Sequence, residues 1–293
     1  MNKAKRRRAV ACIFLIPLAL VNVTVIVGPT IATVAYSFTD WTGLGVPDFV
    51  GVSNYIEIIH DASFWQAFIH NLEWMAVFLT VPIFMGLAGA YLLMSVRRGR
   101  SIYQAIYFIP YMIASVVNAA IWQNILSPNR GIGTALANAG VPWLKDVAFF
   151  GDRRLALGAV AFVDNWHWWG FVAVLFFTAM QAVDPSLYEA AELDGAGRWK
   201  QFLHVTIPSI RPTLMFVLLL SIVWSLLTFD YVYIITQGGP SGATELVSTL
   251  LYRAAFSEFR AGYAAALGVT MMALSAVVIC GYQYLTRKRG WDV

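Results

Sequence analysis

The chain has 293 residues, of which 59% are apolar and only 12% are charged, whereas an ordinary soluble domain has about 25% charged residues. A core of this length cannot hide that much apolar surface in water, so the composition excludes a soluble protein and predicts one that mostly faces lipid. The net charge of +4 does not indicate a nucleic-acid-binding protein, because Lys and Arg gather at the ends of the apolar runs.

Six apolar runs are long enough to cross a bilayer as helices, which takes about 20 residues each. The expected spans are Val10–Tyr36, Leu72–Val96, Tyr103–Leu126, Leu155–Met180, Thr213–Ile235 and Ala261–Leu285. The first follows the basic segment Lys3–Arg8, as in a signal peptide, but its apolar run is about twice as long as a signal-peptide core. We therefore expect a retained span, with cleavage after Ala35 as the alternative.

Basic residues predict the orientation of these spans, because cytoplasmic segments carry an excess of Lys and Arg. With both termini in the cytoplasm, the inner segments hold 14 of the 20 Lys and Arg residues and the outer segments hold 6. The first outer loop, 37–71, carries four acids and no Lys or Arg. We expect a multi-pass protein of the cell membrane, with residues 1–9 and 286–293 as its cytoplasmic ends.

The outer loop 37–71 contains a further periodic segment. We expect an amphipathic helix over Ser53–His70, with Tyr55, Ile58 and Trp65 on its apolar side.

Two negative observations concern chemistry. Cys12 and Cys280 each lie in an apolar run near its basic end, so we expect neither a structural disulfide nor a metal site. The P-loop pattern GxxxxGK[ST] is absent from the sequence, so we expect no ATP hydrolysis by that route and no cofactor in this chain.

The segment 184–212, between the fourth and fifth runs, is charged and compatible with helix. Asp184 is a good N-cap with Pro185 at the first helical position, and Ser186 with Glu189 offers a capping box as a second possible start. We expect a first short helix that includes Tyr188–Leu193.

Glycines and a proline predict where the helices of this segment end. The first helix should stop at Gly195 and Gly197, and a second over Arg198–His204 should stop before Pro208. Between Asp184 and Asp194 there are four acids and no base, whereas a helix that rests on a membrane surface usually carries Lys and Arg. The composition favours docking of this segment in a groove of a partner protein. The alternative is a pair of helices that rests on the lipid head groups.

The same segment carries a family resemblance. Glu189-Ala-Ala191, Gly195 and the later Val205-Thr-Ile-Pro208 resemble the EAA loop of permease subunits in binding-protein-dependent ABC importers. Val205 and Ile207 stand where Ile and Leu are commoner in that loop, and they keep the apolar bulk. The segments similar to the carbohydrate-uptake branch, spread over nearly the whole chain, are Ser37–Trp41, Phe49–Gly51, Asn54-Tyr55, Phe64-Trp65, Asp184–Tyr188, Asp194–Gly197, Phe229-Asp230, Thr236–Pro240, Ala255-Phe256 and Gly262–Ala264.

The resemblance is to the first of two unlike permease subunits, as in maltose-type and glycerol-phosphate-type importers, and it implies a fold. That fold is an all-α polytopic membrane protein with six transmembrane helices, the type I ABC importer permease fold. The first transmembrane helix, 10–36, and the outer loop 37–71 would precede a permease core, 72–285, with 184–212 as its cytoplasmic EAA loop and coupling helix.

The resemblance also implies partners and a mechanism. A second permease subunit would complete a heterodimer, an ABC ATPase dimer with ATP and Mg²⁺ would drive it, and an extracytoplasmic substrate-binding protein would deliver a carbohydrate. This chain would have no catalysis of its own. The residues implied to couple to the ATPase are Glu189, Ala190, Ala191, Asp194, Gly195 and Pro208.

Carboxylates within spans are costly and are functional by default. Asp164 and Asp230 lie about 16 and 17 residues from the inner ends of their spans, or roughly 25 Å at 1.5 Å per residue. We expect them to flank one polar cavity; capping of an outer helix end or pairing with a partner chain is the alternative. The predicted substrate pathway, in which acids accept sugar hydroxyls and rings stack on sugar faces, consists of Asn118, Trp122, Asp164, Trp168, Trp224, Thr228, Asp230 and Tyr233.

Other functions make different demands on the sequence. A sugar-phosphate importer is the nearest alternative, but no Lys or Arg lies mid-span, which favours a neutral carbohydrate. A proton-coupled secondary transporter would use Asp164, His167 and Asp230 as a relay, and we find no internal repeat of the kind such transporters carry. Nothing in the sequence indicates the nucleophile–base pair of a membrane-embedded enzyme. The aromatic positions also fit simple helix packing.

Overall fold

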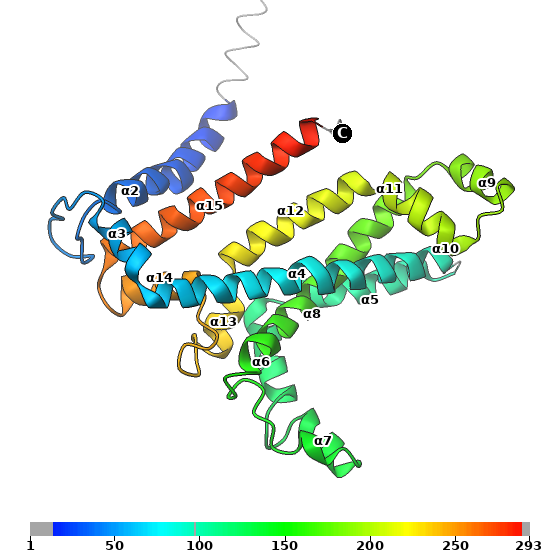
Figure 1. Ribbon diagram of the computed structural model, residues 1–293, viewed down its shortest axis with the longest axis horizontal. Helices are drawn as coiled ribbons and strands as arrows, with labels where there is room; N and C mark the ends of the chain where they lie inside the picture. Colours follow the sequence, from blue (N-terminus) through cyan, green and yellow to red (C-terminus); the bar gives the residue numbers. More distant parts are fainter. Residues whose placement is uncertain (1–13, 97, 289–293) are drawn as a thin grey trace, which may run out of the picture. The chain divides into compact units, whose positions relative to one another are not determined.

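The computed structural model describes residues 14–96 and 98–288, and this part of the chain is nearly all helix, without a β-strand (Figure 1). Five of its helices are long and apolar enough to cross a membrane, or six if one bent pair counts as a span. The basic segment Lys3–Arg8, the start of the first expected span with Cys12, and the charges Arg97 and Arg289 lie outside the described residues.

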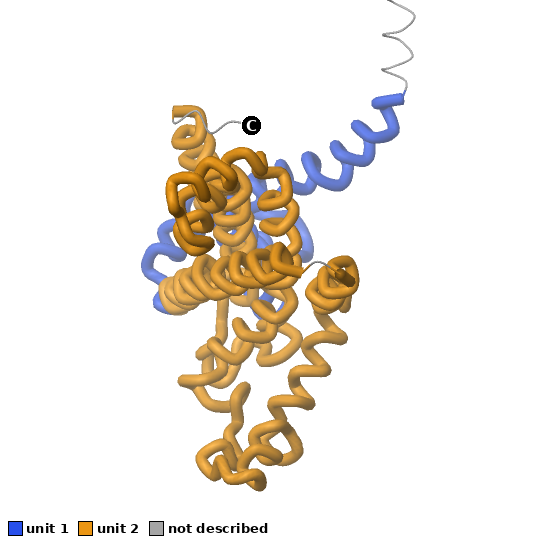
Figure 2. Tube along the Cα trace, turned by 90° about the vertical axis from the view of Figure 1, so that its right-hand side faces the viewer, with its two compact units in different colours: residues 1–62, 251–273 blue, residues 63–250, 274–293 orange. Residues whose placement is uncertain are grey.

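The chain divides into two compact units, coloured separately in Figure 2: residues 1–62 with 251–273, and residues 63–250 with 274–293. The described part of the first unit starts with the helical stretch Phe14–Tyr36, which includes the π-helix η1 (Val23–Val27) and α2 (Gly28–Tyr36). It continues with α3 (Ser53–His60) and, later in the chain, the first part of α15 (Ala261–Lys288).

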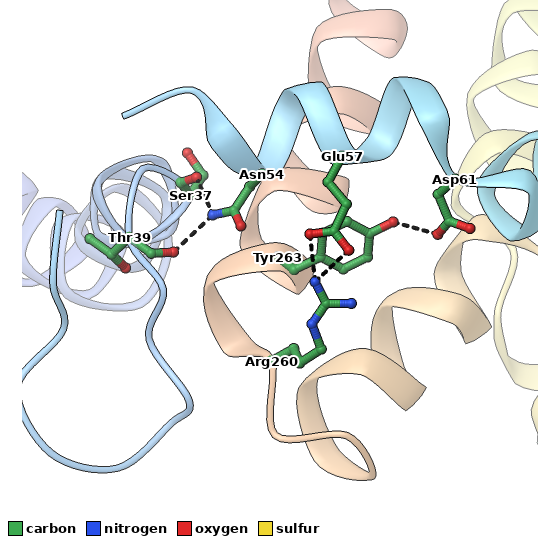
Figure 3. A network of polar contacts seen from close by, with 7 residues as sticks. All are labelled: Ser37, Thr39, Asn54, Glu57, Asp61, Arg260 and Tyr263. Carbon is green, nitrogen blue, oxygen red and sulfur yellow. Dashed lines mark hydrogen bonds and ion pairs between the residues drawn. The ribbon is translucent and has the colours of Figure 1, made fainter. Parts of the chain in front are cut away.

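Polar side chains hold the first unit together (Figure 3). Arg260 donates from Nη2 to both carboxylate oxygens of Glu57 at 2.6 Å, and the Tyr263 hydroxyl donates to Asp61 Oδ2 at 2.6 Å. Asn54, which is buried, donates from Nδ2 to the carbonyl of Ser37 at 2.9 Å. Two of the four acids of segment 37–71 therefore bind groups at the start of α15.

The expected amphipathic helix over residues 53–70 is two elements. Asp61 is extended and ends α3, and α4 (Ala62–Ser95) begins there, ten residues before the predicted start at Leu72. The expected loop 37–71 is therefore too long, because its last ten residues form the first turns of α4. Phe64, Ala67 and Asn71 are buried at helical spacing, so the buried face of α4 continues past the polar residues that had marked a loop.

The third expected span, Tyr103–Leu126, is wrong as one helix. It consists of α5 (Arg100–Met112) and α6 (Ser115–Ile125), which are bent by 94°. Pro110 lies in the last turn of α5, and residues 113 and 114 have extended ψ angles of 129° and 140°. Proline removes a helical hydrogen bond, so the chain can leave the helix at this point.

In the second unit, α8 (Ala156–Gln181) packs closely against α4 and α5. A Cβ atom built on Gly170 would lie 1.8 Å from the carbonyl oxygen of Tyr107, and one on Gly86 would lie 2.6 Å from Val172 Cγ1. In a membrane the lipid is as apolar as the side chains, so the hydrophobic effect does not drive helices together. Helices instead associate through close backbone packing at small residues. These glycines allow α8 to be the central helix of this unit.

The remaining helices of the second unit include a second break. α7 (Ile132–Asn138) and the 3₁₀ turn η2 (Pro142–Leu144) precede α8. Later in the chain, the fifth span consists of α12 (Arg211–Leu227) and α13 (Asp230–Ile235), which are separated at Thr228–Phe229. α14 (Val247–Phe256) follows. The fully buried Asn71 ties these elements together: its Nδ2 donates to the Ser225 carbonyl at 2.8 Å, and its Oδ1 accepts from the Val247 N–H at 3.0 Å.

Candidate functional site

The first part of the site is the helix α9 (Pro185–Leu193), which begins where its sequence predicts. Asp184 Oδ1 accepts the backbone N–H of Ser186 at 2.9 Å, and Pro185 occupies the first turn. This hydrogen bond stabilises the charged form and lowers the pKa of Asp184. Of the two predicted starts, the Asp184 cap is the one that forms.

The end of α9 is also local in origin. Gly195 has φ +75°, its N–H donates to the Glu192 carbonyl at 3.0 Å, and the Ala196 N–H donates to the Ala191 carbonyl at 2.9 Å. These two bonds form a Schellman motif, which needs a left-handed residue and favours glycine there. The predicted stop at Gly195 is confirmed.

The second expected helix is longer than its prediction. α10 (Arg198–Gln201) runs directly into the π-helix η3 (Phe202–Thr206) and then into α11 (Ile207–Ser209). The predicted end before Pro208 is wrong, because Pro208 lies within this run. Its missing N–H falls where the hydrogen-bond register already changes: the Ile207 N–H donates to the Phe202 carbonyl, five residues back.

The predicted coupling residues lie mostly at the surface of this loop. Glu189, Ala190, Asp194, Gly195 and Pro208 are exposed, and Ala191 is half-buried. Two apolar side chains that the prediction did not name lie beside them: Leu193 is 90% exposed and Trp199 is 65% exposed. Their signal in the sequence is a large apolar residue among charges outside any span. Exposed apolar groups of this kind mark interaction surfaces.

The second part of the site is a cavity of about 630 Å³ within the second unit. It lies where two helices are broken, at the α5–α6 junction and the α12–α13 junction, with α8 as the third wall. Four of the predicted pathway residues line it: Asp164, Trp224, Thr228 and Asp230. Non-helical backbone at membrane depth is tolerated where it lines a cavity, so the breaks and the cavity belong together.

The two carboxylates have different surroundings in this cavity. Asp164 is 1% exposed; Trp224 faces it as a donor group, but neither of its oxygens makes a well-formed hydrogen bond within the described chain. Asp230 is exposed, and Ser115 Oγ donates to its Oδ2 at 3.4 Å. Acids, hydroxyls and an indole together offer hydrogen-bond partners and a stacking face to a polyhydroxylated ligand.

Four predicted pathway residues do not line the cavity. Trp168 is buried behind it and stacks on Trp224 with ring centroids 5.5 Å apart. Asn118 is also buried and donates from Nδ2 to the hydroxyl of Tyr231, a wall residue, at 3.0 Å. Trp122 packs on Phe162, with ring centroids 5.0 Å apart, and Tyr233 stacks on Phe229, a wall residue, at 4.9 Å.

Sequence reasoning missed the wall contributed by the α5–α6 junction, including Tyr111 and Ser115. The ring of Tyr111 lies 5.2 Å from the imidazole of His167, which also lines the cavity. The available signal was Pro110 followed closely by Ser115, a pattern that favours a break over an unbroken helix. No three His, Cys, Asp or Glu residues are grouped as metal ligands anywhere in the described chain.

Comparisons with known proteins agree with this architecture. Residues 79–290 match the family model described as "Binding-protein-dependent transport system inner membrane component". The diacetylchitobiose uptake system permease protein NgcF of Streptomyces coelicolor is 34% identical, over 89% of this chain and 77% of its own. The probable ABC transporter permease protein YurN of Bacillus subtilis is 31% identical, over 92% and 93%.

A solved structure shares the fold. The crystal structure of a bacterial ABC transporter involved in the import of the acidic polysaccharide alginate contains a chain that matches with a TM-score of 0.86 at 22% identity, over 98% of both chains.

Proposed function

This chain belongs to the family of inner membrane components of binding-protein-dependent transport systems, and we propose that it forms half of an ATP-driven import pathway for a carbohydrate. The observation that carries the proposal is α9, a capped helix on an exposed loop that presents Glu189 and the 90% exposed Leu193. Such a surface fits a protein partner that applies force from outside the bilayer.

The distribution of charge supports an orientation. With both termini in the cytoplasm, the basic residues divide 14 inside to 6 outside, as the positive-inside rule requires. In this orientation the loop 184–212 faces the cytoplasm, where a nucleotide-driven motor would be found.

The composition of the loop supports an ATPase subunit as its partner. Four acids and no base lie between Asp184 and Asp194, so anionic head groups would repel α9. In the proposed complex the ATPase dimer holds ATP and Mg²⁺, while this chain holds no cofactor and catalyses no reaction. A second permease subunit supplies the other half of the pathway, and an extracytoplasmic binding protein delivers the cargo.

The lining of the cavity supports the choice of cargo. It has carboxylates, hydroxyls and Trp224, and no Lys or Arg among its lining residues. A neutral mono- or oligosaccharide, or a related polyol, is the solute that such groups accommodate without an unpaired charge. NgcF, a relative, is named as the permease of a diacetylchitobiose uptake system. A sugar phosphate is the alternative, for which a partner subunit would have to supply the cation.

Transport by the reconstituted complex tests this function. The expected result is ATP-dependent uptake of a labelled neutral oligosaccharide by proteoliposomes that contain this chain with its partner permease, ATPase and binding protein. Glu189→Lys should abolish that uptake, because it reverses a charge on the exposed face of α9.

A matched control is Asp48→Lys, which makes the same charge change on an exposed acid of the loop between the first two spans. It should keep uptake near that of the parent protein. Uptake that survives Glu189→Lys, or that needs no ATP, would contradict the proposal.

A further inference from the structure

Within the loop 184–212, one side-chain hydrogen bond joins the two halves of the segment. The hydroxyl of Tyr188, on α9, lies 2.9 Å from the hydroxyl of Thr206, at the end of η3. Thr206 is only 6% exposed, and Tyr188 is half-buried. The bond spans the turn at Gly195 and Gly197 and closes a loop of 18 residues.

The turn that this bond spans is soft. A Cβ atom on Gly195 or Gly197 would meet nothing within 4 Å, so no neighbouring group packs against either glycine. Gln201 Nε2 donates to the Ala196 carbonyl at 2.9 Å, and the Ala196 N–H donates to the Ala191 carbonyl of α9 at 2.9 Å, so the turn is tied to each helix by hydrogen bonds close to the glycines. Because no side chain packs at either glycine, this bonded turn is the most flexible joint between α9 and the rest of the loop.

Packing does not fix Tyr188 in place of the bond. Tyr188 and Thr206 border a cavity of about 360 Å³, whose other walls include Phe202, Tyr91 of α4 and Met180 of α8. Tyr188 therefore borders open space rather than a filled core. The hydroxyl pair is thus a specific link between α9 and η3.

Unlike α9, the helix η3 is firmly attached to the spans. The ring of Phe202 is buried against Tyr91 of α4, with centroids 5.0 Å apart, and Trp199 stacks on it at 5.6 Å. The run from η3 through α11 leads into α12, which carries Trp224 to the 630 Å³ cavity. The π turn sets which side of this run Thr206 occupies, because it inserts one residue per turn relative to an α-helix.

We propose that the Tyr188–Thr206 hydrogen bond is a positioning contact for coupling: it makes α9 and η3 one rigid body, so that displacement of α9 moves α12. Without the bond, α9 rotates about the glycine turn and the displacement is lost. This inference rests on the proposed function of α9 as the element that the ATPase moves.

Conservative variants of the two hydroxyls test the inference in the proteoliposome system. Tyr188→Phe and Thr206→Val each remove the bond with little change of shape. Uptake per ATP hydrolysed should fall about five-fold in each, which corresponds to the loss of one ordinary hydrogen bond, while ATP hydrolysis continues. The double variant should be no worse than either single variant, because both remove the same interaction.

Two further variants separate coupling from folding. Thr206→Ser keeps the hydroxyl and should restore the parent ratio of uptake to ATP hydrolysis. Tyr91→Phe removes a hydroxyl that borders the same cavity without touching the bond, and should leave the ratio unchanged.

Two outcomes would overturn the inference: an unchanged ratio of uptake to ATP hydrolysis in Tyr188→Phe and Thr206→Val, whether or not both rates fall together, or additive effects in the double variant. Each of these leaves the proposed function standing if Glu189→Lys still abolishes uptake. ATP-driven uptake by Glu189→Lys would instead remove the proposed function itself.

Discussion

The loop 184–212 and the 630 Å³ cavity belong to the same compact unit, yet they are built in opposite ways. The contacts that begin and end α9 lie within a few residues of it: the Asp184 cap, the Gly195 turn and the bonds of the Schellman motif. The cavity joins the α5–α6 junction, α8 and the α12–α13 junction, over 100 residues apart in the chain. A helix such as α9, which is held by local contacts, can move as a rigid unit. A cavity formed by distant segments of the chain can change shape when those segments move relative to one another.

The largest effect is expected from a change in the turn at Gly195, which ends α9. Gly195→Pro should abolish transport, at least about 100-fold, because proline fixes φ near −65° and the turn needs +75°. Uptake in proteoliposomes measures this effect.

The matched controls for this variant differ in backbone conformation. Gly195→Ala should cost only about 1–2 kcal/mol in the turn and leave partial uptake, and Gly197→Ala should be neutral because Gly197 has φ −67°. Equal effects of alanine at both glycines would show that the left-handed turn is unimportant.

In the cavity, Trp224→Ala should raise the KM for sugar about ten-fold, because it removes one stacking face worth about 1–2 kcal/mol. Uptake kinetics at saturating ATP measure this change. Trp169→Ala on α8, whose ring packs 5.0 Å from that of Tyr107 outside the cavity, should lower thermal stability and keep the KM. A changed KM in Trp169→Ala alone would place the sugar elsewhere.

Adding a methyl group at two positions of α8 tests how tightly this helix packs against α5. Gly170→Ala should destabilise the protein by about 1–3 kcal/mol, because the new Cβ would lie 1.8 Å from the Tyr107 carbonyl oxygen. Gly158→Ala, on the same helix with nothing within 4 Å, should be neutral or stabilising. Thermal unfolding in detergent compares them, and equal melting temperatures would contradict the tight α5–α8 contact.

The smallest effect belongs to the cap of α9. Asp184→Ala should slightly lower helix stability at neutral pH, since it removes the bond to Ser186. Because the pKa of Asp184 is lowered in the folded protein, its contribution is present above the ordinary value of 3.8 and is lost as the pH falls through the folded value. Stability that differs between parent and variant only below pH 4 would reverse this sign.

These two regions also differ in how far the sequence predicts them. The cap, the glycine stop and the exposure of Glu189 follow from neighbouring residues, so pattern reasoning finds them. The second helix is longer than its sequence predicts because the π-helix η3 shifts the hydrogen-bond register just before Pro208, which then lies within α11; helix propensity does not predict π turns.

The cavity was only half predicted. Matched depth along two spans led to Asp164 and Asp230, which do line one cavity. Tyr111 and Ser115 were missed because they enter through a 94° bend, and a hydropathy window does not register a bend. Trp122 packs on Phe162, and Tyr233 stacks on the wall residue Phe229 without lining the cavity itself, since helical spacing predicts a shared face but not what that face contacts. The functional role of all these residues remains a prediction.

The loop 184–212 and the cavity have separate roles in the proposed function: the loop transmits the movement of the ATPase, and the cavity binds the sugar. Measuring both the KM for sugar and the uptake per ATP in Gly195→Ala and Trp224→Ala tests this separation most directly. The loop variant should lower uptake per ATP with an unchanged KM, and the cavity variant should raise the KM with unchanged uptake per ATP at saturating sugar. Two variants that shift the same parameter would contradict it.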